Sequence, residues 1–227
     1  MVAPIPAPIA QIAPDGKLTV RQKRRVLLDM SLRRVRPGTG SSHEFIQRRT
    51  AMIEWPDLRE ILHGLDWVIV GGVATRAYMP ERGTKDMDIL TRQADGETVL
   101  GRLIGAGYKV ITPLAVPGYL LLSPEGVEVD LLLGQFPWLK QALQNVQFDA
   151  AGYPVIDLPY LVLMKLSASR PQDVADIARM LGWADEPTLN RVRTIIAQYS
   201  PEDKDDLESL RYLGQQERLD PDNRLSQ

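Results

Sequence analysis

The sequence predicts a mixed α/β protein (α+β in detail), with a small mixed β-sheet flanked by helices and a helical C-terminal part. Three observations lead to this prediction. Residues 67–70 form an apolar, β-branched run that ends at a glycine pair, as a buried strand does before a turn. Runs at 119–122 and 127–133 flank a turn containing Pro and Gly, which indicates a β-hairpin. From residue 157 onward the pattern is helical.

Size and composition are those of an ordinary globular protein. The 227 residues suffice for one large domain or two small ones, and the chain is 44% hydrophobic and 25% charged. The absence of cysteine excludes disulfides and thiolate metal sites. No apolar run reaches the roughly 20 residues that span a membrane, and the N-terminus lacks the basic start of a signal peptide. We therefore expect a cytoplasmic protein without a membrane partner.

The net charge of −2 is unevenly distributed. Residues 1–50 hold ten Lys or Arg and three Asp or Glu, a net charge of +7, so the remainder carries −9. Within residues 17–36, apolar side chains interrupt the basic ones, which favours a basic amphipathic helix. Such an arm can contact RNA phosphates, stay solvated, or bind a partner protein with an acidic surface.

The N-terminal elements justify a first boundary near residue 42. Residues 1–42 are expected to form a basic, Pro-rich arm that is flexible or partly helical, ending in the linker 37–42. A core then covers residues 43–150, and a helix beginning with a proline is expected at 56–65. After the strand at 67–70, further elements of the core follow in order: a short helix at 73–78, a strand at 86–91, a helix at 96–106, a strand at 108–111 and the hairpin.

The C-terminal region, residues 151–227, is predicted to be helical. Pro171 interrupts the stretch 157–182, because an interior proline lacks the amide hydrogen and clashes with the preceding turn. Two helices meeting at residues 170–171 are therefore expected. Another helix is expected at 186–199, and one more in the acidic tail after Ser200.

The glycine pair Gly71-Gly72 and the two aspartates after it carry the first chemical signal. A strand that turns through glycine into a helix directs backbone N–H groups at an anion such as a triphosphate. Asp86 and Asp88 are two residues apart on a strand, so both side chains share one face. Carboxylate and phosphate oxygens are the ligands that Mg²⁺ prefers.

A third acid, Asp130, lies in the apolar strand 127–133. Glu128 and Asp130 share one face of that strand, and Leu132 places apolar surface beside Asp130. Burying a carboxylate is costly unless it meets a cation or hydrogen-bond donors. Asp130 is therefore the expected third ligand and general base, in preference to Glu128, which is nearer the turn.

Together these motifs resemble the DNA polymerase beta-like nucleotidyltransferase superfamily. The resembling pattern is an apolar strand, Gly-Gly, a helix, Arg-x-Thr-x-Asp-x-Asp and a later apolar strand with Asp. Residues 158–176, with Lys165, Arg170, Asp173 and Asp176, resemble the Lys-x-x-Ala-x-Arg-x-x-Asp-x-x-Asp region of AbiEii-type nucleotidyltransferases. These include toxins of type IV toxin–antitoxin systems. The resemblance covers roughly residues 60–182.

The resemblance implies a nucleotidyltransferase fold with residues 43–150 as the catalytic core, and an enzyme that transfers a nucleotide from an NTP, such as ATP or GTP, to a hydroxyl. Two Mg²⁺ ions would be the cofactors. Catalysis and metal binding would fall to Asp86, Asp88 and Asp130, and nucleotide binding to Gly71, Gly72, Arg82, Thr84, Lys165 and Asp176. Lys165 would reach the β/γ-phosphates as a point charge. Asp176 would hold Lys165, which requires both on one face of an unbroken helix.

Alternatives to this assignment stay open. Partners other than the NTP can be RNA, tRNA in particular, contacted through residues 17–36, or a cognate antitoxin protein; a protein hydroxyl is a further acceptor. The chain can instead be an inactive nucleotide-binding regulatory module, or a transferase acting on a small molecule such as an antibiotic. Lys165 can also be a side chain that extends along an amphipathic helix. Arg170, Asp173 and Asp176 can be a charge cluster at a helix start.

Overall fold

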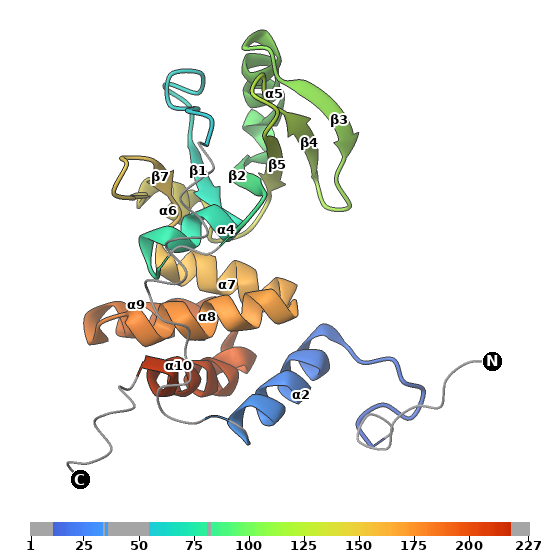
Figure 1. Ribbon diagram of the computed structural model, residues 1–227, viewed down its shortest axis with the longest axis vertical. Helices are drawn as coiled ribbons and strands as arrows, with labels where there is room; N and C mark the ends of the chain where they lie inside the picture. The colour runs from blue at the N-terminus through green and yellow to red at the C-terminus, as the bar shows by residue number, and fades with distance from the viewer. Residues whose placement is uncertain (1–10, 34, 36–54, 81–82, 219–227) are drawn as a thin grey trace. The chain divides into compact units, whose positions relative to one another are not determined.

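The computed structural model describes residues 11–33, 35, 55–80 and 83–218 (Figure 1). The chain forms two compact units, each described by itself. A sheet unit contains the described residues from 55 to Leu161, and a helical unit contains those before residue 40 together with those from Val162 onward. The mixed α/β class predicted from the sequence is confirmed.

A seven-stranded mixed sheet is the framework of the sheet unit, in the order β3-β4-β5-β2-β1-β7-β6. The pairs β2–β5 and β1–β7 are parallel, and the other neighbours are antiparallel. The strands are β1 (Trp67–Val70), β2 (Asp86–Arg92), β3 (Lys109–Pro113), β4 (Gly118–Leu122), β5 (Glu128–Gly134), β6 (Gln147–Phe148) and β7 (Pro154–Val155).

One face of the central strands is fully buried. Met87 and Ile89 of β2 and Val129 and Leu131 of β5 have no exposed surface, as expected for alternate residues that point into a core. Helix α5 (Gly96–Gly105) contacts β2 and buries its own apolar stripe. The unit also contains α4 (Gly71–Ala74), η1 (Thr75–Ala77), η2 (Gln93–Asp95) and α6 (Leu139–Gln144).

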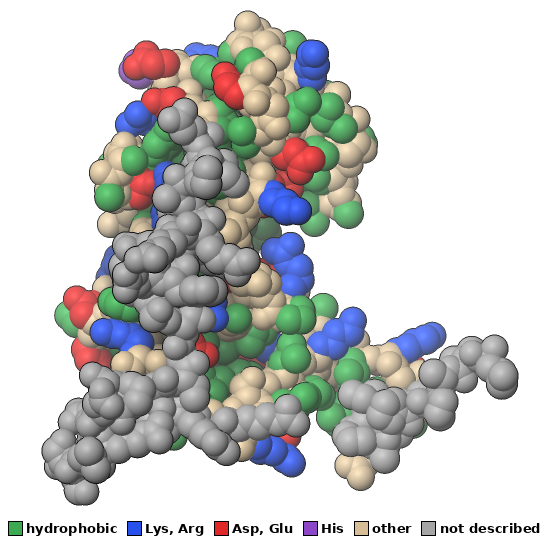
Figure 2. All heavy atoms as spheres, in the orientation of Figure 1, with side chains coloured by type: hydrophobic (Ala, Val, Ile, Leu, Met, Phe, Trp, Pro, Cys, Tyr) green, Lys and Arg blue, Asp and Glu red, His purple; other side chains and the backbone are tan. Residues whose placement is uncertain are grey.

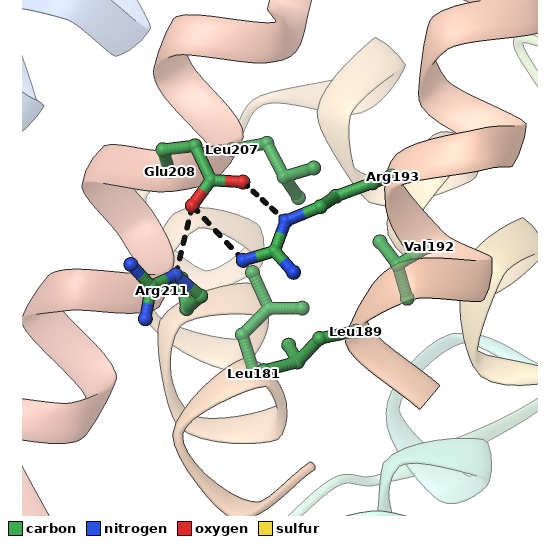
Figure 3. Close-up of a pocket in the computed structure, with 7 residues that line it drawn as sticks. All are labelled: Leu181, Leu189, Val192, Arg193, Leu207, Glu208 and Arg211. Atoms are coloured by element: carbon green, nitrogen blue, oxygen red, sulfur yellow. Dashed lines mark hydrogen bonds and ion pairs between the residues drawn. The ribbon is translucent and has the colours of Figure 1, made fainter. Parts of the chain in front are cut away.

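The helical unit is built from α2 (Val20–Leu32), the last residues of α7 (Leu158–Ala168), α8 (Pro171–Trp183), α9 (Glu186–Tyr199), η3 (Pro201–Asp203) and α10 (Lys204–Arg218). A small pocket between α8, α9 and α10 is lined by Leu181, Leu189 and Leu207 (Figure 3). Glu208 also lines this pocket and accepts hydrogen bonds from Arg193 Nε at 2.7 Å and Arg211 Nε at 2.8 Å. Both arginines hold the pKa of the Glu208 carboxyl below its ordinary value, Arg193 most strongly, against the opposing effect of burial.

Most predicted elements are confirmed. The structure contains the helix predicted at 96–106, as α5, the hairpin β4–β5, the break before Pro171, the helix at 186–199 and the last helix. The helix predicted at 73–78 differs in its bounds, because helical structure begins at Gly71 as α4 and continues as the 3-10 helix η1. The helix predicted at 56–65 is wrong: the segment makes hydrogen-bonded turns, among them Leu62 N–H to Leu58 O at 2.8 Å, and Gly64 has φ +76°. Leu58 and Leu62 are both fully buried, so the segment packs into the core although it is not a regular helix.

No helix of the described residues is long and apolar enough to cross a lipid bilayer.

Candidate active site

Strand register brings the predicted acids onto one face of the sheet. In the parallel pair β2–β5, Asp88 lies opposite Asp130, and Asp86 lies opposite Glu128. Directly opposed residues of neighbouring strands point to the same side. Asp86, Asp88 and Asp130 therefore share the face that is opposite to the buried core residues. Glu128, which we expected to be a less suitable metal ligand than Asp130, also lies on this face.

The Gly71 backbone closely approaches Asp88. Gly71 has φ +63°, and a Cβ added there would lie 1.8 Å from Asp88 Oδ2. The left-handed backbone and this contact both require glycine. Since α4 has only four residues, its dipole adds little attraction for an anion. A phosphate role for Gly71 and Gly72 therefore rests on close backbone approach.

Thr84 orients Asp86: Thr84 Oγ1 donates a hydrogen bond to Asp86 Oδ1 at 2.7 Å. The threonine thus supports a metal-ligand candidate directly. Arg82 lies outside the described residues.

The electrostatics of this face favour a cation. Burial raises the pKa of Asp130, and the charges of Asp86 and Glu128 raise that pKa further. A divalent cation would offset the repulsion, and carboxylate oxygens suit Mg²⁺, so the donor set fits the implied metal. Within the described part of the chain, no three His, Asp or Glu side chains already converge on a point that could hold a metal ion.

Lys165 and Asp176 meet in the helical unit, together with Asp173. Lys165 Nζ donates to Asp176 Oδ2 at 2.8 Å and to Asp173 Oδ1 at 3.1 Å, and the Lys165 side chain is 4% exposed. The expectation that this contact requires an unbroken helix is wrong. The chain turns between α7 and α8, and the turn brings the start of α8 beside Lys165.

Asp173 also belongs to the start of α8. It accepts hydrogen bonds from Arg170 Nε at 2.7 Å and from the Arg170 backbone N–H at 3.2 Å. Burial favours the neutral acid, but the hydrogen bond from Arg170 and the charge of Lys165 hold the Asp173 pKa below its ordinary value. Asp173 therefore belongs to a charge cluster at a helix start, as one alternative predicted, and also contacts Lys165.

Asp173→Asn should make the helical unit less stable, and the loss should depend on pH. A folded-state pKa below the unfolded value of about 3.9 stabilises the protein above that pH, and the contribution disappears as the pH falls through the folded value. We expect a loss of about 2 kcal/mol at pH 7 that shrinks below about pH 4, measured by urea unfolding across this range. Asp205→Asn, at an exposed position of α10, is the matched control, and an equal pH-dependent loss in it would contradict the assignment.

The basic segment contains internal ion pairs that sequence reasoning missed. Arg24 is 2% exposed and contacts Asp203 and Asp206, while Arg25 Nε lies 3.3 Å from Asp206 Oδ1. The sequence feature that could have indicated these pairs is the opposite charge of residues 17–36 and of the acidic segment after Ser200. On the face shown in Figure 2, basic and acidic side chains are interspersed.

Comparisons with known proteins give distant structural matches. No protein-family model matches the sequence, and no curated protein matches it. A candidate nucleotidyltransferase from Thermotoga maritima (TM1012) is 16% identical, with a TM-score of 0.39, over 51% of this chain and 84% of that one. The antibiotic-resistance factor ANT(2'')-Ia is 14% identical, with a TM-score of 0.39, over 68% and 87% of the two chains.

The Cid1 poly(U) polymerase is 13% identical with a TM-score of 0.27, and the match covers 82% of this chain and 50% of that one. At these identities and TM-scores the matches do not establish a family for the chain.

Proposed function

We propose that this protein is an Mg²⁺-dependent nucleotidyltransferase that moves a nucleotide from an NTP to a hydroxyl. One observation carries the proposal: the paired register of β2 and β5 puts Asp86, Asp88 and Asp130 on one sheet face, beside the turn at Gly71. Carboxylates that share one sheet face next to a close backbone approach are suited to metal-bound phosphates. Residues 43–150 would be the catalytic core.

The proposed reaction forms a bond between the acceptor oxygen and the α-phosphorus and breaks the bond from that phosphorus to the bridging oxygen, so that pyrophosphate leaves. Asp130 takes the proton of the acceptor hydroxyl. Asp86 and Asp88 would hold the metal ions, with Thr84 orienting Asp86. When bound, two Mg²⁺ ions would neutralise charge on the entering and leaving oxygens.

Phosphate binding is proposed for Gly71 and Gly72 through their backbone, and for Arg82 and Lys165 through their charges. Lys165 would exchange part of its contact with Asp173 and Asp176 for the β/γ end of the triphosphate. Asp176 would keep the ammonium group aimed, because a buried lysine needs a charged partner. This role comes from the AbiEii resemblance.

The acceptor is proposed at the level of class: an RNA such as tRNA, or a protein hydroxyl, in a toxin–antitoxin setting with an antitoxin partner. The internal pairing of Arg24 and Arg25 leaves less of segment 17–36 available for RNA, so Lys17 and Lys23, which are exposed, would carry such a contact. Transfer to a small molecule, as in ANT(2'')-Ia, shares the same chemistry.

The test incubates the purified chain with Mg²⁺, each α-labelled NTP, and total RNA or cell lysate. We expect label in one acceptor class, loss of transfer on adding EDTA, and recovery with excess Mg²⁺, since negatively charged carboxylates and a triphosphate repel each other unless divalent cations neutralise them. Calorimetry with each NTP is run in parallel. Nucleotide binding without labelling of any acceptor would support a regulatory module and contradict the transferase.

A further inference from the structure

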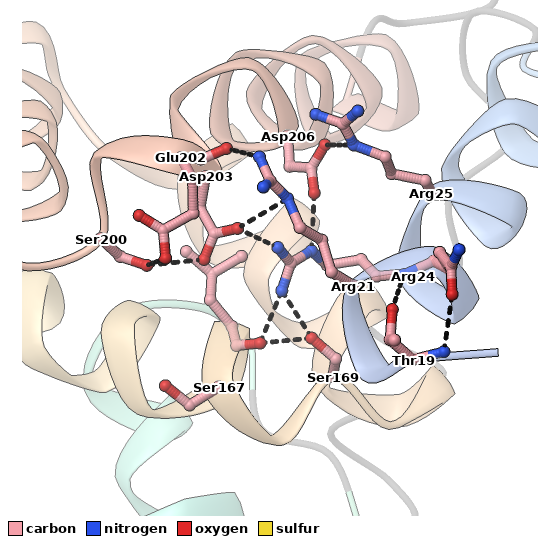
Figure 4. A network of polar contacts seen from close by, with 12 residues as sticks. Thr19, Arg21, Arg24, Arg25, Ser167, Ser169, Ser200, Glu202, Asp203 and Asp206 are labelled. Carbon is pink, nitrogen blue, oxygen red and sulfur yellow. Dashed lines mark hydrogen bonds and ion pairs between the residues drawn. The ribbon is translucent and has the colours of Figure 1, made fainter.

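Arg24 of α2 is a buried cation that is almost fully hydrogen-bonded. Its Nε donates to Asp206 Oδ2 at 2.8 Å, and its Nη2 pairs with Asp203 (Figure 4). Its Nη1 donates to the Leu166 carbonyl and to Ser169 Oγ, both at 2.6 Å. A guanidinium that is 2% exposed needs such partners, because burial without them is strongly unfavourable.

Two of these contacts fall where α7 ends. The last carbonyls of a helix lack intrahelical donors, and a cation near them is favourable. Ser169 follows α7 with φ +47°, a left-handed conformation that is uncommon for a residue other than glycine. The Ser169 N–H donates to the Lys165 carbonyl at 2.8 Å. Arg24 therefore holds the Ser169 side chain and the Leu166 carbonyl, while the Lys165 carbonyl holds the Ser169 backbone N–H.

This turn determines the surroundings of Lys165. Only two residues, Ser169 and Arg170, connect α7 to α8, so the direction of α8 depends on the backbone there. Lys165 sits one turn before Ser169, and its Asp173 and Asp176 partners lie in the first two turns of α8. A change in the turn would move both aspartates relative to the ammonium group.

We propose that Arg24 is a positioning residue for Lys165, and that α2 is an intramolecular brace for the α7–α8 turn. The inference rests on the proposed function in one respect, the role of Lys165 toward the nucleotide. The basic segment would then have a structural role within this chain. Arg24 donates hydrogen bonds at the end of α7, and it is itself held by Asp203 of η3 and Asp206 of α10. Among the residues that the structure describes, the half-exposed Arg25 pairs with Asp206 only, so it lies outside this path.

The direct test observes the Lys165 ammonium by NMR in protein labelled with ¹⁵N-lysine, with Lys165→Met used for assignment. A buried, doubly hydrogen-bonded ammonium should exchange slowly and give a resolved signal. We expect that signal in the wild type and in the control Arg25→Met, and its loss or broadening in Arg24→Met. An unchanged signal in a folded Arg24→Met protein would overturn the proposal.

Arg24→Lys covers the case in which Arg24→Met does not fold. Lysine keeps the positive charge but cannot reproduce the fork that reaches Leu166 O and Ser169 Oγ together with the two aspartates. We expect a folded protein in which the Lys165 signal is weakened. A Lys165 signal identical to that of the wild type would contradict a role for the fork.

A double-mutant cycle with the transfer assay tests whether Arg24 acts through Lys165. Arg24→Met should lower kcat/KM for the NTP about tenfold, mainly through KM, because small displacements of a positioned group are costly. In the Lys165→Met background the same change should have no further effect. Additive effects would refute the brace. If the wild type transfers no nucleotide, the proposed function fails, while the NMR result still decides whether Arg24 holds Lys165.

Discussion

Replacing Asp88 with alanine should greatly reduce nucleotide transfer and leave the fold intact. Asp88 is the residue that links the three features of the candidate site: it lies opposite Asp130, two residues from Asp86, and against the Gly71 backbone. Losing its carboxylate would remove charge stabilisation worth several kcal/mol in the transition state. We expect kcat/KM to fall by about 1,000-fold, measured by transfer of α-labelled NTP.

The same substitution should not unfold the protein. Asp88 is half-buried and lies on the sheet face opposite the buried core residues, so its truncation leaves the packing of that core unchanged. The thermal midpoint should stay within a few degrees of the wild type. Asp86→Ala and Asp130→Asn should behave in the same way.

Glu128→Gln is the matched control, because it removes a carboxylate from the same sheet face. It should change kcat/KM by less than about threefold if Asp130, and not Glu128, is the third ligand. Normal transfer by both Asp88→Ala and Asp86→Ala would show that the site has been misassigned.

Gly214→Ala should destabilise the helical unit. A Cβ added to Gly214 would lie 1.8 Å from the Ala178 carbonyl oxygen and 2.9 Å from Gly182 N, so the backbones of α8 and α10 nearly touch. Alanine favours a helix over glycine by about 1 kcal/mol. Overpacking against backbone typically costs about 1 to 3 kcal/mol, and here no flexible side chain can move away, so we expect a net loss of about 2 kcal/mol.

Urea unfolding at pH 7 measures this loss, and Gly101→Ala in α5 is the control. Gly101 is also helical, but a Cβ there meets nothing within 4 Å. Its substitution should stabilise the protein by about 0.5 to 1 kcal/mol, through helix propensity alone. If both substitutions stabilise the protein, the close contact of α8 with α10 is not present in solution.

Regular patterns along the chain predicted most of the secondary structure. The alternation around Asp130 and the break at Pro171 are local signals, since side-chain direction and proline geometry act within a few residues. The segment at 56–65 shows the limit of such signals. Its composition suits a helix, yet the backbone makes hydrogen-bonded turns that end near Gly64, whose left-handed conformation stops a helix. The two-residue strands β6 and β7 are too short to carry a period.

The sequence by itself determined the spacing of the acids, the glycine that faces them and the charge imbalance between the two ends of the chain. Only the tertiary structure decided which groups meet. Strand register placed Asp130 opposite Asp88 and added Glu128, because a shift by one residue would have sent Asp130 to the core face. The turn at Ser169 brought Asp176 to Lys165 across a helix break, and folding buried Arg24 against Asp203 and Asp206. Such contacts join residues 11 to 182 positions apart, and their energy comes from burial and hydrogen bonding that no local pattern encodes.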